Sequence, residues 1–160
     1  MKKYVFPILM IALLVSSFSC KKDEKLDSDT PAVSCLIDGV LWKASEISVM
    51  QDESDNLVDI SCQDVSYDQN FKLSFFCTGN GTVNFAKNNY DNFGSYTVIS
   101  SLGVFSSNYS SNPSGQVVIT EYDKAKKTIS GTFHFNAHDN QGNKKSFTEG
   151  KFTNLYIWIL

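Results

Sequence analysis

Arginine is absent from this sequence. Its 14 basic residues are all lysines, they are outnumbered by 17 acidic residues, and the formal net charge is −3. Proteins that recognise nucleic acids or phosphate groups rely on a basic surface and on the forked hydrogen bonds of the guanidinium group. The composition therefore argues against nucleic acid as a partner, and it leaves a glycan, a protein or a small apolar ligand open.

Cysteine and histidine are scarce, with four and two residues, and there is no Cys-x-x-Cys motif. His134 and His138 lie in a strand-like segment, where a rise of about 3.3 Å per residue separates them by roughly 13 Å. One metal ion cannot bridge that distance. The acidic stretch 52–56 lacks the glycine and the spaced acids of an EF-hand calcium loop. We predict neither a metal site nor a cofactor.

Motifs of covalent hydrolases are missing as well. Serines are abundant, but no Gly-x-Ser-x-Gly elbow is present, and neither histidine has a recognisable catalytic partner near it in the sequence. A pair of glycosidase carboxylates could lie anywhere among the 17 acidic residues. The sequence thus favours a protein that is not an enzyme, with a hydrolase acting on a glycan as an alternative.

The first nineteen residues have the order of a secretory signal peptide. Lys2 and Lys3 precede an apolar run over residues 4–15, and small residues follow it. This run of 12 residues is shorter than the roughly 20 apolar residues that a membrane-spanning helix needs. We therefore predict that residues 1–19 are a cleaved leader and not a permanent membrane helix.

Cys20 stands at the end of this leader and is followed at once by charged residues. The arrangement resembles the lipobox of bacterial lipoproteins, with Ser17 at the minus-three position in place of the commoner leucine. In that pathway the thiol is diacylglycerated, the leader is removed and the new amino terminus is acylated. The resemblance implies attachment to a membrane through acyl chains on Cys20. A secreted protein with one spare thiol is the alternative.

The charged residues after Cys20 carry a second signal. Lys22, Asp23 and Glu24 resemble the lysine-plus-two-acids export signal that sends Bacteroidota lipoproteins to the outer face of the outer membrane. The expected location is therefore the cell outer membrane, facing the exterior, and a periplasm-facing anchor is the alternative. Residues 20–32 have little to bury, which is typical of a flexible tether. A single domain is expected over residues 33–160.

Alternation of apolar and polar residues dominates the chain from residue 33 onward, in short runs bounded by Gly, Asn, Asp and Ser. Strands are expected at 34–37, 40–43, 46–50, 57–63, 71–77, 117–122, 128–138 and 147–158 and, with weaker patterns, at 96–100 and 104–107. Asp38-Gly39 suits a type I′ hairpin turn. Because no helix is available to cover a sheet, we predict an all-β domain, an antiparallel β-sandwich or flattened β-barrel of roughly eight to nine strands.

Three cysteines besides Cys20 fall in these strand-like runs: Cys35, Cys62 and Cys77. At most one pair of the three can close. Buried free thiols are favoured because cysteine is common in apolar strands, and a disulfide between Cys62 and Cys77 is the main alternative.

Two apolar or aromatic segments invite a prediction of their own. The serine-rich stretch 100–115 contains Phe105 and Tyr109, which are expected to cap the core or, alternatively, to contact a ligand. The final run 155–160 is almost wholly apolar and is expected to lie between neighbouring strands, because an exposed apolar strand invites aggregation. Pairing with another chain by strand addition is the alternative.

The last third of the chain resembles a known family. The segments are Gly115–Asp123 (GQVVITEYD), Thr128–Phe135 (TISGTFHF) and Thr148–Phe152 (TEGKF), together with an amino-terminal hairpin that ends in Trp42. They are similar to the ending and the first hairpin of a family of small Bacteroidota lipoproteins, the domain of unknown function numbered 6252. The resemblance supports the fold and the location, and because no activity is assigned to that family it implies no functional residue.

The expected function follows from these points. We expect a surface-exposed outer-membrane lipoprotein that acts as a non-enzymatic binding or accessory module, with a glycan, a protein or a small apolar ligand as its partner. A barrel rich in phenylalanine could hold the apolar ligand in a lipocalin-like cavity. A structural or assembly role in a surface fibre or envelope complex is the alternative.

Overall fold

The computed structural model describes residues 31–85, 91–110, 112 and 114–160. The expected signal peptide, Cys20 and the export signal Lys22, Asp23 and Glu24 lie outside the described residues, as does most of the tether. Within the described ranges, no helix is long and apolar enough to cross a membrane.

The all-β prediction is confirmed. Twelve strands and one short 3-10 turn, η1 (Ser107–Tyr109), make up the regular structure of the described residues. The strands are β1 (Val33–Ile37), β2 (Val40–Lys43), β3 (Glu46–Asp52), β4 (Leu57–Gln63), β5 (Gln69–Phe76), β6 (Gly81–Asn84), β7 (Phe93–Val98), β8 (Gly103–Ser106), β9 (Gly115–Asp123), β10 (Thr128–His138), β11 (Lys144–Tyr156) and β12 (Trp158–Ile159).

The strands form one open, mixed sheet with the order β12-β3-β4-β5-β7-β8-β10-β11-β1-β2, and β9 pairs with both β10 and β6. The expected number of eight or nine strands was too low. The sheet is also not antiparallel throughout, because β12 runs parallel to β3. The described strands thus form neither of the two expected architectures, which were a sandwich of two separate sheets and a closed barrel.

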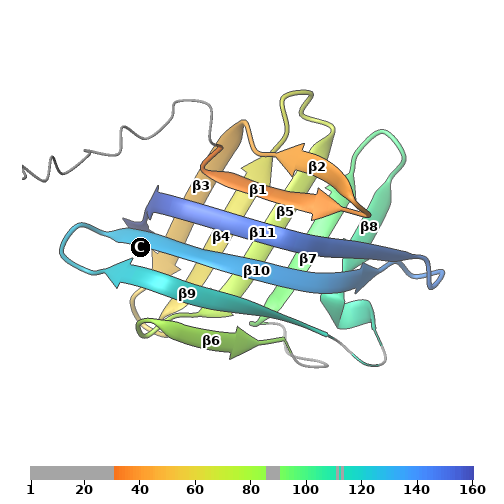
Figure 1. Cartoon of the computed structure of the whole chain (residues 1–160). Helices are drawn as coiled ribbons and strands as arrows, with labels where there is room; N and C mark the ends of the chain where they lie inside the picture. Colours follow the sequence, from red (N-terminus) through yellow and green to blue (C-terminus); the bar gives the residue numbers. More distant parts are fainter. Residues whose placement is uncertain (1–30, 86–90, 111, 113) are drawn as a thin grey trace, which may run out of the picture.

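Two halves of this sheet face each other (Figure 1). One half is the meander of β3, β4, β5, β7 and β8, and the other holds β6, β9, β10, β11, β1 and β2. They are joined where His138 at the end of β10 pairs with Ser106 of β8. Figure 1 shows β9, β10, β11 and β1 crossing in front of β4, β5 and β7, so that one face of each half points inward.

Aromatic side chains fill the space between the two halves. The Phe71 ring of β5 lies 5.1 Å from the Phe133 ring and 5.9 Å from the Phe147 ring, measured between centroids. The Phe135 and Phe147 rings stack at 4.3 Å. These rings occupy the place where a lipocalin-like cavity would lie, so we place no ligand in the interior.

Glycines make room for these rings. A Cβ atom added to Gly94 would lie 2.4 Å from Cζ of Phe135, and one added to Gly150 would lie 2.4 Å from the ring of Phe133. Such distances are far below van der Waals contact. The aromatic rings therefore lie directly on the bare backbone of the opposite or neighbouring strand.

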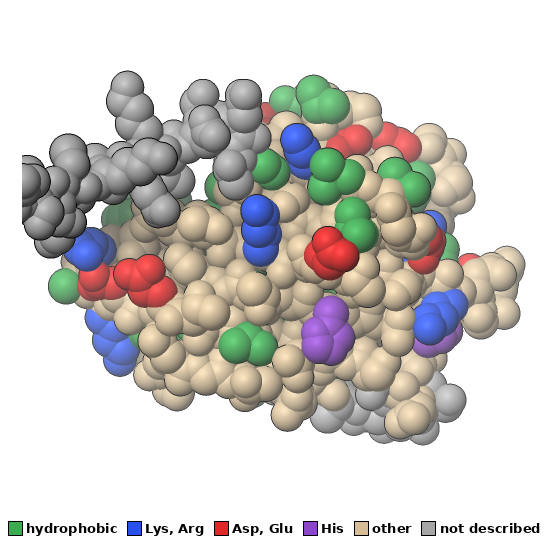
Figure 2. All heavy atoms as spheres, in the orientation of Figure 1, with side chains coloured by type: hydrophobic (Ala, Val, Ile, Leu, Met, Phe, Trp, Pro, Cys, Tyr) green, Lys and Arg blue, Asp and Glu red, His purple; other side chains and the backbone are tan. Residues whose placement is uncertain are grey.

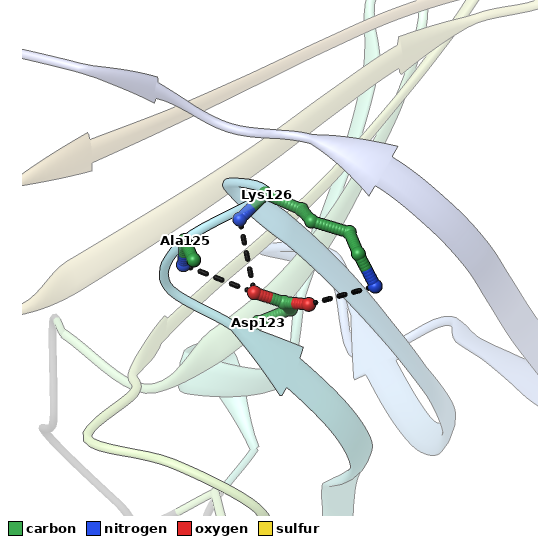
Figure 3. A network of polar contacts seen from close by, with 3 residues as sticks. All are labelled: Asp123, Ala125 and Lys126. Atoms are coloured by element: carbon green, nitrogen blue, oxygen red, sulfur yellow. Dashed lines mark hydrogen bonds and ion pairs between the residues drawn. The ribbon is translucent and has the colours of Figure 1, made fainter.

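The turns follow the chemistry expected from their sequences. Asp38 and Gly39 have φ angles of 51° and 83°, so both central residues are left-handed, as the type I′ turn requires. Between β9 and β10, the carboxylate of Asp123 accepts hydrogen bonds from the backbone N–H groups of Ala125 at 3.0 Å and Lys126 at 2.9 Å (Figure 3). These bonds, with the Lys126 ammonium group at 3.0 Å, lower the pKa of Asp123.

The carboxyl-terminal run is less buried than expected. Leu155 and Ile157 are in the core, but Trp158 and Leu160 are 64% and 76% exposed. The reason is that β12 lies at the end of the strand order and pairs only with β3 among the described strands. The expectation of a fully covered last strand was therefore wrong.

Candidate functional site

Large apolar side chains are exposed at one end of the molecule. Val40 and Leu41 of β2 are 70% and 59% exposed, Val65 in the β4–β5 turn is 82% exposed, and Leu102 in the β7–β8 turn is 86% exposed. In Figure 2, green apolar side chains gather with acidic and basic ones in the upper part of the view, over the end of the sheet that carries these turns in Figure 1. Val40, Leu41 and Val65 also line one groove, and apolar side chains gathered in this way are typical of interaction sites.

Hydrogen bonds hold the two turns of the meander together. The backbone N–H of Ile99 donates to the carbonyl oxygen of Asp68 at 2.8 Å, and the N–H of Ser100 donates to the Asp68 carboxylate at 2.7 Å. Leu102 follows with a φ of 53°, a left-handed conformation that is rare for a large side chain. This conformation closes the tight β7–β8 turn, in which the Leu102 N–H donates to the carbonyl oxygen of Ile99 at 3.1 Å.

A groove of about 560 Å³ separates β2 from the β4–β5 turn. The residues that matter for its chemistry are Val40, Leu41, Trp42, Val65, Tyr96 and Lys145. We call it the β2 groove. It combines exposed apolar side chains with two aromatic rings and a charged group, the composition that ligand sites of proteins share.

Lys145 closes one wall of the β2 groove. Its ammonium group lies 5.9 Å from the ring centre of Tyr96 and 5.4 Å from that of Phe105, within the range of cation–π contacts. It also lies 3.2 Å from the carboxylate of Asp38. Burial, and then the nearby Asp64, Asp68, Cys35 and Asp38, raise the pKa of Tyr96 to about 12. The wall therefore offers a neutral phenol beside a fixed ammonium group.

Trp42 contributes an unused hydrogen-bond donor. Its side chain is only 6% exposed and its ring packs 5.5 Å from the ring of Phe71. Its Nε1 atom is buried and has no hydrogen-bond partner among the described residues. A buried donor without an acceptor is unfavourable by about 1–3 kcal/mol. Because the ring packs against the core, the Trp42 side chain forms part of the buried floor of the β2 groove.

A second hollow, of about 500 Å³, lies over β3, β4, β5 and β7. Small polar side chains such as Ser61 and Ser95 line it. Its amide groups bond to each other, because Nε2 of Gln63 donates to Oδ1 of Asn70 at 2.9 Å. The β2 groove is the stronger candidate, since it has both exposed apolar side chains and the charged group of Lys145.

The cysteines expected in strands are buried, and the three described thiols are free. Cys62 is paired with Phe71 in the β4–β5 ladder, whereas the N–H of Cys77 donates to the carbonyl oxygen of Asn56. Cys77 therefore lies beside Asn56, which precedes Cys62 by six residues, or about 20 Å of strand. A disulfide needs Cα atoms within about 7 Å. In this register, the alternative of a Cys62–Cys77 disulfide does not form.

The buried thiols are expected to be unreactive in the native protein. Burial raises the pKa of Cys35 and of Cys62 to about 12, with the neighbouring Cys35 adding to the effect on Cys62. Iodoacetamide at mildly alkaline pH should leave both unmodified and should label both in guanidinium chloride, as measured by intact mass. Labelling of the native protein at either residue would contradict the structure.

Burial of these thiols should also lower the stability of the protein at alkaline pH. Below the ordinary thiol pKa of 9.0 they are protonated in both states; between about 9 and 12 only the unfolded state releases protons. The free energy of unfolding should therefore fall as pH rises through this range, by about 1.4 kcal/mol per pH unit for each thiol. Denaturant titrations of wild type and Cys35→Ala measure this, and the variant should show a shallower slope.

The histidines lie on β10, as expected. His134 is exposed and His138 is partly buried, at the pair with Ser106. Among the described residues, no group of three histidine, cysteine, aspartate or glutamate side chains is placed to hold a metal ion. In the serine-rich stretch, Phe105 packs against the core and Tyr109 is 50% exposed.

The β2 groove was not found from the sequence. One signal was present: Val65 is a large aliphatic residue inside the turn 64–68, which has an aspartate at each end. Lys145 and Tyr96 carried no such signal, because their positions in the groove depend on which strands become neighbours.

Comparison with known proteins identifies the family. No curated protein and no solved structure matches the chain. A family model described as a domain of unknown function, DUF6252, matches residues 29–155. That range contains the whole β2 groove, the strands β1 to β10 and all of β11 except its last residue, Tyr156. The chain therefore belongs to the DUF6252 family.

Proposed function

We propose that this protein is a non-enzymatic binding module, anchored in the outer membrane by acyl chains on Cys20 and facing the cell exterior, which binds its partner in the β2 groove. The observation that carries the proposal is the exposure of Val40, Leu41 and Val65 around one groove that Lys145 also lines. Soluble domains rarely leave such side chains together on the surface without a partner.

The site also has the rigidity that recognition needs. Its walls come from strands and from short turns tied to the sheet, since Asp38 accepts hydrogen bonds from the Ser146 N–H at 2.8 Å and from Lys145 at 3.2 Å. A preformed site loses little conformational entropy when a partner binds. A macromolecular partner in the cell envelope fits this open groove better than a small molecule, which would bind in an enclosed cavity.

A structural role is a second candidate, and β12 is the observation that favours it. This edge strand pairs only with β3 among the described strands, and Trp158, Ile159 and Leu160 are exposed beside it. The Trp158 ring meets the Tyr156 ring edge-on at 5.3 Å. Such an apolar edge can accept a strand from another subunit of an assembly.

Site-specific photo-crosslinking on intact cells tests the two candidates together. A photoreactive amino acid replaces Val65 in the β2 groove, Leu160 beside β12, or Thr132, an exposed control on β10. The binding-module proposal expects a crosslinked product from the Val65 position and none from Thr132. Products from the Leu160 position alone would instead support assembly, and a Val65 position that gives none would contradict the proposed function.

A further inference from the structure

We infer that the partner binds by strand addition: an extended polypeptide segment pairs with the outer edge of β2 and places apolar side chains in the β2 groove. This inference rests on the proposed function and specifies the chemical class of the partner. It is carried by the hydrogen-bond register of β2, by its unpaired outer edge and by the exposed side chains next to that edge.

The register shows which backbone groups of β2 face outward. The β1–β2 hairpin has a two-residue turn, and its pairs include Ile37↔Val40 and Cys35↔Trp42. In such a hairpin these pairs exchange hydrogen bonds, and the residues between them turn their N–H and C=O groups away. The bond from Ala44 N–H to the Val33 carbonyl oxygen, at 3.1 Å, continues the same alternation. Leu41 and Lys43 therefore direct their backbone groups outward.

That outer edge is unpaired among the described strands, since β2 ends the strand order and pairs with β1 alone. Proteins usually protect an edge with charged residues, proline or a covering loop. Lys43 is the only charged residue of β2, and the exposed Val40 and Leu41 make the edge apolar and do not protect it. An edge of this kind is a template for one more strand.

The other exposed strands fit this role less well. β12 has only two residues, which limits the ladder that it can extend. β6 has four residues, but these are Gly81, Thr82, Val83 and Asn84, with Val83 turned against the core. β2 alone of these three strands borders the groove formed with Val65 and Tyr96.

A polypeptide is the occupant whose chemistry matches all of these features. Its backbone supplies alternating donors and acceptors to the outward groups of Leu41 and Lys43. Its side chains point alternately to the two faces of the sheet, so every second one meets the groove. A lipid chain has no row of donors and acceptors, and a glycan lacks the two-residue period.

A segment of another protein is favoured over a second copy of this chain. The chain has a net charge of −3, and in a symmetric β2–β2 pair the two Lys43 residues would also lie close together. Both effects disfavour self-association. A segment that alternates apolar and polar residues, with basic residues at its ends, would be favoured electrostatically.

The test removes one outward N–H group and leaves the rest of the edge in place. Leu41→Pro deletes this donor, which the pairing with β1 does not use, and proline is tolerated on an edge strand. Leu41→Ala is the matched control, because it loses the same side chain and keeps the N–H. The probe is a fluorescent peptide of alternating valine and threonine with a lysine at each end, titrated into the full-length lipidated protein. We expect Leu41→Pro to bind about tenfold more weakly than Leu41→Ala.

Amide hydrogen exchange gives a readout that does not depend on any variant. Bound peptide should slow exchange at Leu41 and Lys43 and leave Val40 and Trp42, which already bond to β1, nearly unchanged. Equal binding by the two Leu41 variants, or no added protection at Leu41 and Lys43, would overturn strand addition. If Leu41→Pro proves unstable, Lys43→Pro can replace it, because it deletes the second outward N–H group. It should weaken peptide binding by a similar factor.

Crosslinking from the Val65 position separates this inference from the proposed function. If a product forms equally in the Leu41→Pro and Leu41→Ala backgrounds, the groove binds a partner but not as a strand. A product that is carbohydrate, or a dimer of this chain, would overturn the assignment to a segment of another protein. Loss of the product in Leu41→Pro alone supports it.

Discussion

Replacing Cys20 with serine is expected to move the protein from the membrane fraction to the soluble fraction. Serine lacks the thiol that accepts the diacylglyceryl group, and each buried methylene of an acyl chain contributes about 0.8 kcal/mol to membrane binding. Three acyl chains anchor a protein almost permanently. Without them, the loss of the protein from the membrane fraction should be close to complete. Ser17 and Ser19 suit ordinary signal peptidase, so the variant should still be cleaved and released.

Fractionation with labelled palmitate measures this effect. The wild type should incorporate label and sediment with membranes, and Cys20→Ser should do neither. A double variant, Asp23→Ala with Glu24→Ala, is the control, because it keeps the acylated cysteine and should change only sensitivity to protease added outside the cell. If the Cys20→Ser protein stayed in the membrane fraction, this result would contradict the lipid anchor and the location that we propose.

Replacing Phe135 with alanine is expected to cause the largest loss of stability. The ring is 2% exposed and contacts four others, with centroid distances of 4.3 Å to Phe147, 5.7 Å to Phe85, 5.9 Å to Phe71 and 6.4 Å to Phe133. Truncation of a buried phenylalanine destabilises a protein by about 3–5 kcal/mol. Since small domains are stable by about 5–15 kcal/mol, this is a large fraction of the total.

Thermal unfolding checks this prediction. A loss of this size should lower the unfolding midpoint by about 10–20 °C in a domain of this length. Phe76→Ala is the matched control, because Phe76 ends β5 and is 36% exposed. It should lower stability by no more than about 1 kcal/mol. Equal effects of the two substitutions would mean that the aromatic cluster does not hold the halves of the sheet together.

Most of the strands could be predicted because their patterns are local. The alternation in β10 and β11, the polar turn between them and the Asp38-Gly39 turn all depend on residues that are neighbours in the sequence. The strand β6 was missed because Gly81 and Asn84 disfavour a strand, and it exists because β9 offers a partner. The separate β12 was missed for a related reason: residues 155–160 read as one apolar run, and only the parallel pairing of Trp158 with Met50 divides it from β11.

The candidate site shows the same limit. Trp42 was placed on the first hairpin from the sequence, but its neighbours Val65, Tyr96 and Lys145 come from three other parts of the chain. They meet because β1 pairs with β11, more than 100 residues away, and because the meander folds across that pair. No local pattern encodes these contacts.

The sequence by itself determined the all-β class and the Asp38-Gly39 hairpin turn, and it gave rise to the predictions of a lipid anchor and of a partner other than nucleic acid, since each depends on composition or on adjacent residues. Only the tertiary structure decided the strand order, the aromatic filling of the interior and the β2 groove. The physical reason is that hydrophobic burial is non-directional. Which apolar faces meet, and which edge stays unpaired, depends on the packing of the whole sheet.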